Sequence, residues 1–258
     1  MPEITEYKPG TPIWVDLGTS DVPAAVTFYT KLFGWEAQDL GPEAGGYTMF
    51  RLRGKYVAAV GPLQNPQQPV AWSTYLATAD ADATARKVKE AGGTALMEPF
   101  DVFTSGRMGV FMDPTGAAIL AWQPRSHKGA ELANEPNTRG WSELLTRDVE
   151  KARTFYKAAF GLDSAPFEGM NYYIWSVDGR GVGGLMQMPD EIPQNVPPYW
   201  LTYFVVEDCD AAVRQVGDLG GSTRVPPTDI PNVDRFAVVA DPQGGTFAVI
   251  KSAPPASA

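Results

Sequence analysis

The sequence predicts an α+β protein of two tandem domains, each built from two βαβββ modules. The first observation is an internal repeat, in which Trp14–Trp35 (WVDLGTSDVPAAVTFYTKLFGW) recurs as Trp141–Leu162 (WSELLTRDVEKARTFYKAAFGL). The second is that each copy has the pattern of a strand, a capped amphipathic helix and a terminating glycine. The third is that a related segment follows in each half and leads to a DPxG turn. Together these repeats indicate a duplicated domain.

The first module begins with a predicted strand over Trp14–Leu17, which places Trp14 and Asp16 on one face. Ser20 or Asp21 can cap the next helix. The apolar residues of this helix recur at three- and four-residue spacing, and the helix ends at Gly34; they are Ala25, Phe28, Tyr29, Leu32 and Phe33. Further strands are predicted over Tyr47–Leu52 and Tyr56–Val60.

The second module repeats this plan, and the second half repeats both modules. Its predicted elements are a strand over Trp72–Thr78, a helix over Ala81–Ala91 capped by Asp80, and strands near Thr94–Met97, Arg107–Met112 and Ala117–Trp122. We expect residues 11–124 and 138–252 to form the domains and 125–137 to form a polar, structureless linker. Residues 1–10 should form an arm, and the tail SAPPASA should be disordered.

Composition limits the classes of partner. The net charge of −9 and the pI of about 4.7 disfavour nucleic acid, and no apolar run approaches the roughly 20 residues of a membrane span. The N-terminal segment lacks the features of a signal peptide, and a single cysteine fits a reducing compartment, so a cytoplasmic location is expected. His127 is the only histidine, which excludes a histidine-rich metal site within one chain. We expect it to be solvated in the linker.

The order of motifs resembles the vicinal oxygen chelate superfamily. An Asp-capped helix carrying FYxxxFG, a glycine-closed second helix and a DPxG turn occur twice and cover nearly the whole chain. The superfamily includes glyoxalase I, bleomycin-resistance proteins, fosfomycin-resistance enzymes and extradiol dioxygenases. The chain is most similar to its two-domain actinobacterial members, which are described as glyoxalase-like proteins or hydroxylases. The resemblance implies two eight-stranded sheets, each curled around a cavity with the helices outside.

Enzymes of this superfamily hold a divalent metal on His, Glu or Gln from the first, fifth and eighth strands of a domain. The resemblance puts these positions on residues that are not metal ligands: Trp14 and Trp141, Trp72 or Ser73, Trp200 or Leu201, Leu120 and Ala248. Transition metals need imidazole, carboxylate or thiolate donors, and an indole has no accessible lone pair. We therefore expect no metal and no other cofactor.

Aromatic and acidic residues replace the metal ligands as candidates for function. Indoles in these places can form the floor of a cavity for a flat ligand, although core packing is an equal alternative. Asp16 and Glu143 follow Trp14 and Trp141 by two, and we expect each inward carboxylate to pair with an arginine, Arg107 or Arg235. The candidate catalytic residues are Asp16, Glu143, Tyr75 and Tyr203, and the candidate ligand-binding residues are Trp14, Trp72, Arg107, Trp141, Trp200 and Arg235.

Three functions remain open. The first is a metal-independent protein that binds a small apolar or aromatic metabolite, either to sequester a toxic compound or in secondary-metabolite biosynthesis with a partner enzyme. The second is an enzyme, either a glyoxalase-like lyase or a tailoring oxygenase or hydroxylase. The third is a protein-interaction module with vestigial cavities. Because the duplication supplies what single-copy relatives obtain by dimerising, we expect a monomer or a weak dimer.

Overall fold

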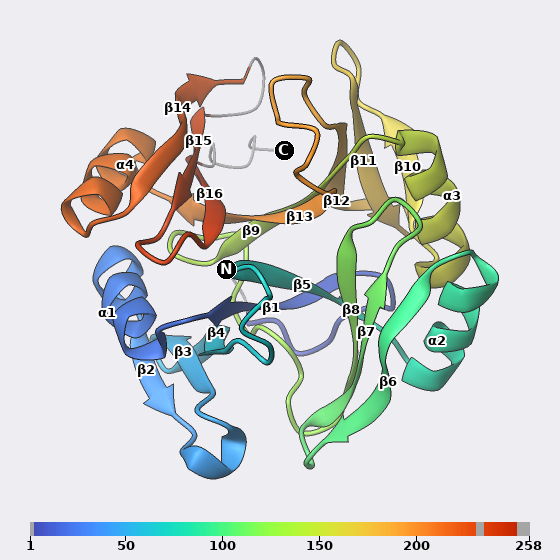
Figure 1. The fold of residues 1–258 in the computed structure, drawn as a ribbon, viewed down its shortest axis with the longest axis horizontal. Coiled ribbons are helices and arrows are strands. Elements are labelled where there is room, and N and C mark those ends of the chain that lie inside the picture. Colours follow the sequence, from blue (N-terminus) through green and yellow to red (C-terminus); the bar gives the residue numbers. More distant parts are fainter. Residues whose placement is uncertain (1–2, 231–234, 252–258) are drawn as a thin grey trace.

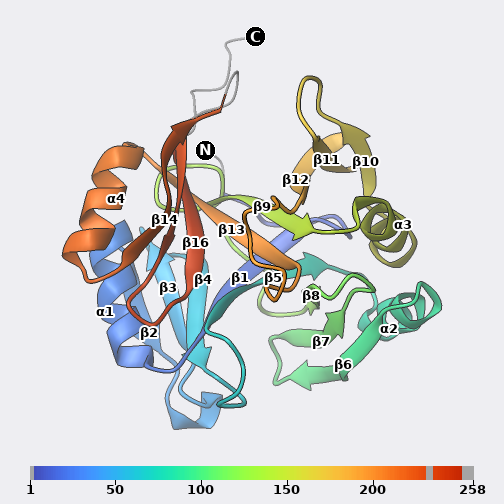
Figure 2. The same ribbon diagram turned by 45° about the horizontal axis from the view of Figure 1, so that its top comes forward.

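The computed structural model describes residues 3–230 and 235–251, and the tail predicted to be disordered lies outside them. Over these residues the chain forms two eight-stranded mixed sheets (Figure 1). Four α-helices, two from each half, cover one face of the sheets, which we call the outer face (Figure 2). The opposite, curled face of each sheet is the inner face. The predicted α+β fold of four βαβββ modules in two tandem sheets is confirmed.

The first half contains two modules. Their elements are β1 (Pro12–Thr19), α1 (Val22–Phe33), β2 (Glu36–Asp39), the 3-10 turn η1 (Pro42–Ala44), β3 (Thr48–Leu52), β4 (Lys55–Pro62), β5 (Ala71–Ala77), α2 (Ala81–Glu90), β6 (Thr94–Val102), β7 (Gly106–Met112) and β8 (Ala118–Pro124). The strand order is β2-β3-β4-β1-β5-β8-β7-β6, so the first strands of the two modules lie at the centre of the sheet.

The second half has the same plan. Its elements are β9 (Arg139–Thr146), α3 (Val149–Phe160), β10 (Asp163–Pro166), β11 (Tyr172–Val177), β12 (Arg180–Gln187), β13 (Tyr199–Val206), α4 (Cys209–Asp218), β14 (Ser222–Asp229), β15 (Arg235–Ala240) and β16 (Thr246–Lys251). The order β10-β11-β12-β9-β13-β16-β15-β14 repeats that of the first sheet. Sequence patterns did not predict β2 and β10, because these four-residue edge strands are mostly exposed and polar and lack apolar alternation.

The helix signals in the sequence act as expected. The Asp21 side chain accepts a hydrogen bond from the Ala24 amide at 3.0 Å, and Gly34 ends α1 in the left-handed conformation with φ of 68°. Asp148 and Gly161 do the same for α3. None of the helices in the described ranges is long and apolar enough to cross a membrane.

The strand register decides which side chains face inward. β1 and β5 are antiparallel, and Asp16 lies opposite Ser73 while Leu17 lies opposite Trp72. Directly paired residues share a face of the sheet, so Ser73 lies with Asp16 on the inner face and Trp72 lies with Leu17 on the outer face. In the second half, Trp200 is paired with Leu144 in the same way.

The outer faces of the two halves form common cores. α1 lies beside α4 and α2 lies beside α3, so that each helix pair contains one helix from each half (Figures 1 and 2). One core packs Phe33 and Trp72 of the first half against Phe204 and Phe247 of the second. Neither half could bury its outer face alone.

A hydrogen-bonded chain of three side chains runs through each common core. Trp72 Nε1 donates to the Tyr29 hydroxyl at 3.0 Å, and this hydroxyl donates to Asp241 Oδ2 of the other half at 2.9 Å. The equivalent chain in the second core consists of Trp200, Tyr156 and Asp113. The aspartates come from the DPxG turns, which therefore connect the halves as well as closing a hairpin.

Replacing Tyr29 with Phe should lower the free energy of unfolding by about 1.5–3 kcal/mol, because the change leaves a buried carboxylate oxygen and an indole N–H without their partner. Urea denaturation measures the loss. Tyr173→Phe is the matched control, since the structure records no hydrogen bond for the Tyr173 hydroxyl within the described ranges, and it should change stability by less than about 0.5 kcal/mol. An equal effect of both variants would contradict the role of the Tyr29 bond.

Candidate functional site

A buried carboxylate lies at the centre of the inner face of each half. In the first half, Asp16 Oδ2 accepts hydrogen bonds from the hydroxyls of Tyr75 at 2.6 Å and Tyr47 at 2.9 Å. Trp14 Nε1 donates to the Tyr47 hydroxyl at 3.2 Å. As expected from the sequence, Trp14 and Asp16 share a face, and Tyr75 joins them through the pairing of β1 with β5.

The second half repeats this cluster with glutamate in place of aspartate. The Tyr203 hydroxyl donates to Glu143 Oε2 at 2.9 Å, the Tyr172 hydroxyl also bonds the carboxyl, and Trp141 Nε1 donates to Tyr172 at 2.9 Å. Gly184 makes room for the group, because a Cβ there would collide with the Tyr172 hydroxyl. The cluster is thus built from β9, β11, β12 and β13.

Among the described residues no cation contributes to the pKa of either carboxyl group, so burial has the largest effect on its protonation. Burial raises the pKa of Glu143 and of Asp16, although the hydrogen bonds from the tyrosines oppose the shift. Burial and the neighbouring carboxylate raise the pKa of Tyr203 and Tyr75, which therefore remain protonated donors. Each cluster can hold or exchange one proton with a bound polar group.

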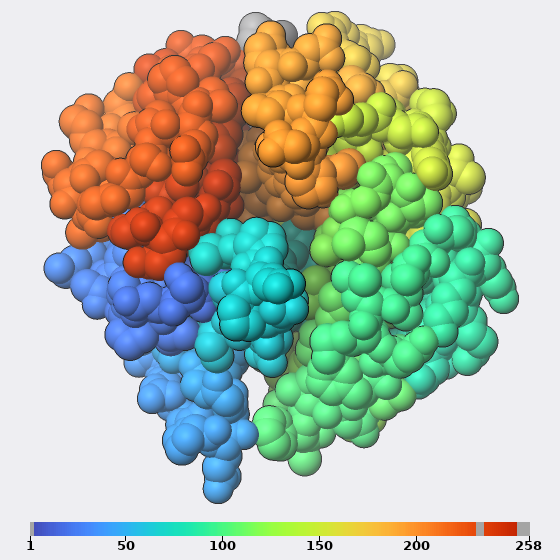
Figure 3. Space-filling view, viewed as in Figure 1, coloured from blue at the N-terminus to red at the C-terminus, as the bar shows by residue number. Residues whose placement is uncertain are grey.

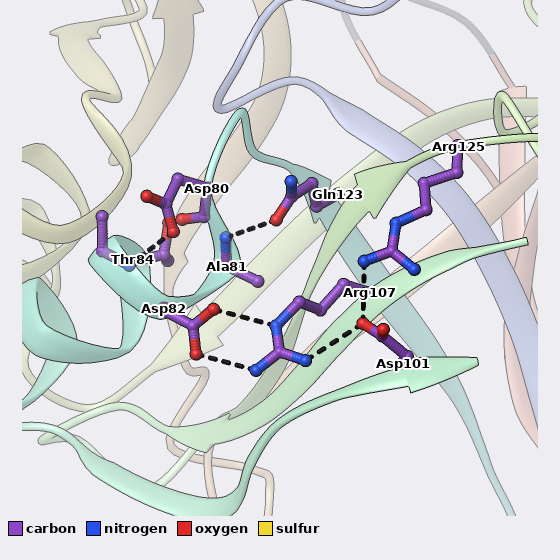
Figure 4. A network of polar contacts seen from close by, with 9 residues as sticks. Asp80, Ala81, Asp82, Thr84, Asp101, Arg107, Gln123 and Arg125 are labelled. Carbon is purple, nitrogen blue, oxygen red and sulfur yellow. Dashed lines mark hydrogen bonds and ion pairs between the residues drawn. The ribbon is translucent and has the colours of Figure 1, made fainter. Parts of the chain in front are cut away.

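The predicted pairs Asp16–Arg107 and Glu143–Arg235 are wrong. Arg107 forms a bidentate ion pair with Asp82 at the start of α2, in which Nε and Nη2 donate to the two carboxylate oxygens at 2.9 and 2.8 Å (Figure 4). Its Nη1 also donates to Asp101 at 3.0 Å. Arg235 makes the equivalent contacts with Asp210 and Asp229. Both arginines connect a helix to the edge of its sheet, because the first turn of that helix supplies a closer carboxylate than the inner face does.

Two of the four tryptophans expected to line the cavities lie on the other side of the sheet. Trp72 and Trp200 occupy the common cores, where each has Tyr29 or Tyr156 as its hydrogen-bond acceptor. Trp14 and Trp141 are the pair on the inner faces. They differ in exposure, since Trp14 is only 3% exposed and Trp141 is half-buried.

His127 fills the inner face of the first half. It was expected to be solvated, but its ring packs edge-on against Trp14, with ring centroids 4.5 Å apart, and contacts Tyr56 and Trp122. The linker is held there by Ala130, whose amide donates to Ile13 and whose carbonyl accepts from Tyr7. Burial lowers the pKa of His127 to about 4. Residues 125–137 contain no helix or strand, and the segment packs against the first half.

The second half has an open space where the first half has a tyrosine. Register places Tyr56 of β4 and Gly181 of β12 at equivalent positions, three residues before Ala59 and Gly184, which face Asp16 and Glu143. Gly181 borders a cavity of about 350 Å³ that Trp141 also lines. The N-terminal arm, from Ile4 to Thr11, and the start of β9 complete its wall. Trp141 therefore borders a cavity, whereas Trp14 contacts the chain's own side chains.

The profile of the Glyoxalase/Bleomycin resistance protein/Dioxygenase superfamily matches residues 12–120 and again 138–249. The chain belongs to this superfamily. Two similar proteins of the superfamily span almost the full length of the chain. CFP32 of Mycobacterium tuberculosis, whose name describes a candidate glyoxylase, is 45% identical over 98% of this chain and 99% of its own. The anthracycline biosynthesis protein DnrV of Streptomyces peucetius is 41% identical over 96% of this chain and 95% of its own.

Solved structures share the fold at low sequence identity. The Mn(II)-bound glyoxalase of Novosphingobium aromaticivorans aligns with a TM-score of 0.67 and 15% identity over 95% of this chain and 82% of that one. The 2,2',3-trihydroxybiphenyl 1,2-dioxygenase of Sphingomonas wittichii aligns with a TM-score of 0.66 and 14% identity over 95% of this chain and 91% of that one. At this identity the likeness concerns the fold.

The residues of the inner faces do not fit the divalent metal of the superfamily's enzymes. The polar groups around Asp16 are two phenols, an indole and the Ser73 hydroxyl, and Leu120 packs in the same cluster. Around Glu143 they are two phenols and an indole, and Ala248 belongs to that cluster. No group of three or more His, Cys, Asp or Glu side chains in the described ranges could hold an ion. One carboxylate among neutral phenols is a poor ligand set for these metals.

Residues that distinguish the two halves were missed in the sequence. Gly181 replaces Tyr56, and Arg139 at the start of β9 occupies the position of Pro12 in β1. The signal for these residues lies in the differences between the two repeats, whereas the identities between the repeats indicate the scaffold. Loops of unequal length between the helix and the following strands also hide the alignment of Tyr56 with Gly181.

The imidazole of His127 should titrate near pH 4, because burial removes it from water and penalises its charged form. Its usual pKa is 6.5, so acidification from pH 6.5 towards 4 favours the unfolded state and destabilises the protein. Since the chain contains one histidine, a single NMR resonance reports this pKa. The urea-unfolded chain is the control. A native pKa close to 6.5 would show that the ring is solvated.

Glu143→Gln should change the pH dependence of stability. The pKa of Glu143 in the folded protein is raised above the usual 4.5. As the pH rises from 4.5 towards this higher pKa, Glu143 loses its proton in the unfolded state first, and the wild type is destabilised. The amide carries no charge and can still accept from Tyr203. Relative to this variant, the wild type should lose up to about 1.4 kcal/mol per pH unit within that window. Urea denaturation at several pH values measures the difference, and parallel curves would contradict it.

Proposed function

We propose that the chain binds a small, flat, largely apolar metabolite in its second half, without a metal ion. The observation that carries the proposal is the cavity beside Trp141, which exists because Gly181 stands where the first half has Tyr56. Its volume of about 350 Å³ falls at the lower end of small-molecule sites. The half-buried indole of Trp141 offers a face for stacking.

The inner face next to Trp141 supplies apolar walls and a few polar groups. Tyr199 and Phe236 are half-buried there and pack with the cluster that contains Tyr203. The Glu143 carboxyl can accept a hydrogen bond from a ligand hydroxyl or, when protonated, donate one to a carbonyl. The cavity itself has a mixed lining, in which Trp141 and Val182 lie beside charged residues such as Arg139. The relative DnrV is named as an anthracycline biosynthesis protein, which supports a role in the biosynthesis of a compound of that kind, and sequestration of such a compound is the other expected role.

A second candidate function is proton transfer on the bound molecule, as in a tailoring enzyme or a lyase. The observation in its favour is the raised pKa of Glu143 between two tyrosine hydroxyls, because carboxyls with raised pKa values cluster at catalytic sites. In this reading Glu143 accepts or donates the proton, and Tyr203 orients it. A turnover assay with Glu143→Gln separates this function from binding alone.

Gly181→Tyr should weaken the binding of a planar probe such as 1,8-dihydroxyanthraquinone at least tenfold, because the new ring fills the cavity as Tyr56 fills the first half. Trp141→Ala should weaken it by a similar factor through loss of stacking and buried area. Isothermal titration calorimetry measures the affinities, and exhaustive dialysis against a chelator should leave them unchanged.

Gly217→Tyr is the matched control, because it adds the same side chain on the exposed surface of α4. Its affinity should equal that of the wild type. Binding that needs a stoichiometric transition metal would refute the metal-independent proposal. If no planar probe binds at all, the protein-interaction alternative is favoured instead.

A further inference from the structure

Arg139 is a buried cation without an acidic partner in the described part of the chain. It lies at the start of β9, is 5% exposed, and donates through Nη2 to the Pro12 carbonyl at 3.0 Å. The Tyr7 phenol, a neutral group, is its other polar contact, and its Nε has no hydrogen-bond partner among the described residues. The guanidinium thus retains donors and a full charge that the protein leaves uncompensated.

An uncompensated buried charge is costly, and this one is buried beside a cavity. Removing a guanidinium from water without an opposite charge is unfavourable by several kcal/mol. The same low dielectric strengthens its attraction for any anion that reaches it. Arg139 lines the cavity of about 350 Å³ next to Trp141, with Gly181 on the neighbouring strand. An anion in this cavity would supply the missing partner.

The other charged groups of the cavity compensate one another more fully. Lys8 and Asp178 form an ion pair at 2.6 Å and are each 68% exposed, so water screens them. Arg180 and Glu6 are also exposed and carry opposite charges. The unbalanced charge inside the cavity is therefore that of Arg139.

The first half lacks this feature. The position of Arg139 is occupied by Pro12 in β1, and the linker lies along the neighbouring strand β4, where the Glu131 amide and carboxylate bond the backbone of Tyr56. The cation and the cavity thus occur together, in the half where Tyr56 is replaced by Gly181.

We propose that Arg139 forms an anion subsite, which takes the carboxylate of an otherwise apolar aromatic ligand whose ring contacts Trp141. This inference rests on the proposed function and specifies the class of ligand. The planar guanidinium fork suits a carboxylate, which it can bind through two parallel hydrogen bonds. The net charge of −9 repels free anions at long range, so an acid with an apolar ring is favoured over small inorganic anions.

The test compares two probes that share the naphthalene ring: the anion naphthalene-2-carboxylate and its neutral methyl ester. At pH 7.5 the wild type should bind the carboxylate at least tenfold more tightly than the ester, as measured by calorimetry. Arg139→Gln should bind both probes equally, whereas Arg139→Lys should retain part of the preference. Arg224→Gln, which removes an exposed arginine of β14, should behave as the wild type.

The possible results separate the two proposals. Equal binding of both probes by the wild type overturns the anion subsite and leaves the proposed function intact. Failure of both probes to bind overturns both. A preference for the carboxylate that persists in Arg139→Gln assigns the charge recognition to another residue and also overturns the inference. If Arg139→Gln does not fold, Arg139→Lys decides, and a preference for the carboxylate as large as that of the wild type overturns the inference.

Discussion

The tyrosine–aspartate hydrogen bonds across the common cores constrain the whole molecule. Tyr29 reaches Asp241, and Tyr156 reaches Asp113, so each half provides the partner for a buried group of the other. The same aspartates hold their DPxG turns through the second carboxylate oxygen. A turn, a helix and a tryptophan therefore depend on one another across the boundary between the repeats. The inner faces lie on the opposite sides of the sheets and form separate clusters, which take no part in the common cores.

The two inner faces are built around a carboxylate and two phenols. Hydrogen bonds from neutral phenols stabilise the buried carboxyl group of each cluster, whereas the superfamily's metalloenzymes balance their carboxylates with a cation. Asp16 and Glu143 accept hydrogen bonds from tyrosines at equivalent places, and an indole completes each cluster. The polar centre of each inner face is thus held by hydrogen bonds among the chain's own side chains.

Duplication allows the two centres to differ. In the first half, His127 and Tyr56 cover Trp14, and the chain itself provides the contacts that a ligand would make. In the second half, Gly181 and Arg139 leave space and a positive charge beside Trp141. In the proposed function the first half serves stability and the second half serves binding, while the common cores keep both folded. The residues shared by both copies form the scaffold, whereas the cavity depends on residues that differ between them.

The sequence by itself determined the duplicated architecture, because the local signals are strong and repeated. Capping aspartates, terminating glycines and the apolar spacing of α1 and α3 depend on neighbours a few residues away. The placement of Trp14 and Asp16 on one face also follows from strand geometry alone. Tertiary structure decided the rest. The register of β1 with β5 places Trp72 on the outer face. Arg107 forms its ion pair with Asp82 in the first turn of α2 and not with Asp16. Folding of the linker placed His127 on Trp14, because such contacts depend on packing between segments distant in the chain, which no local pattern records.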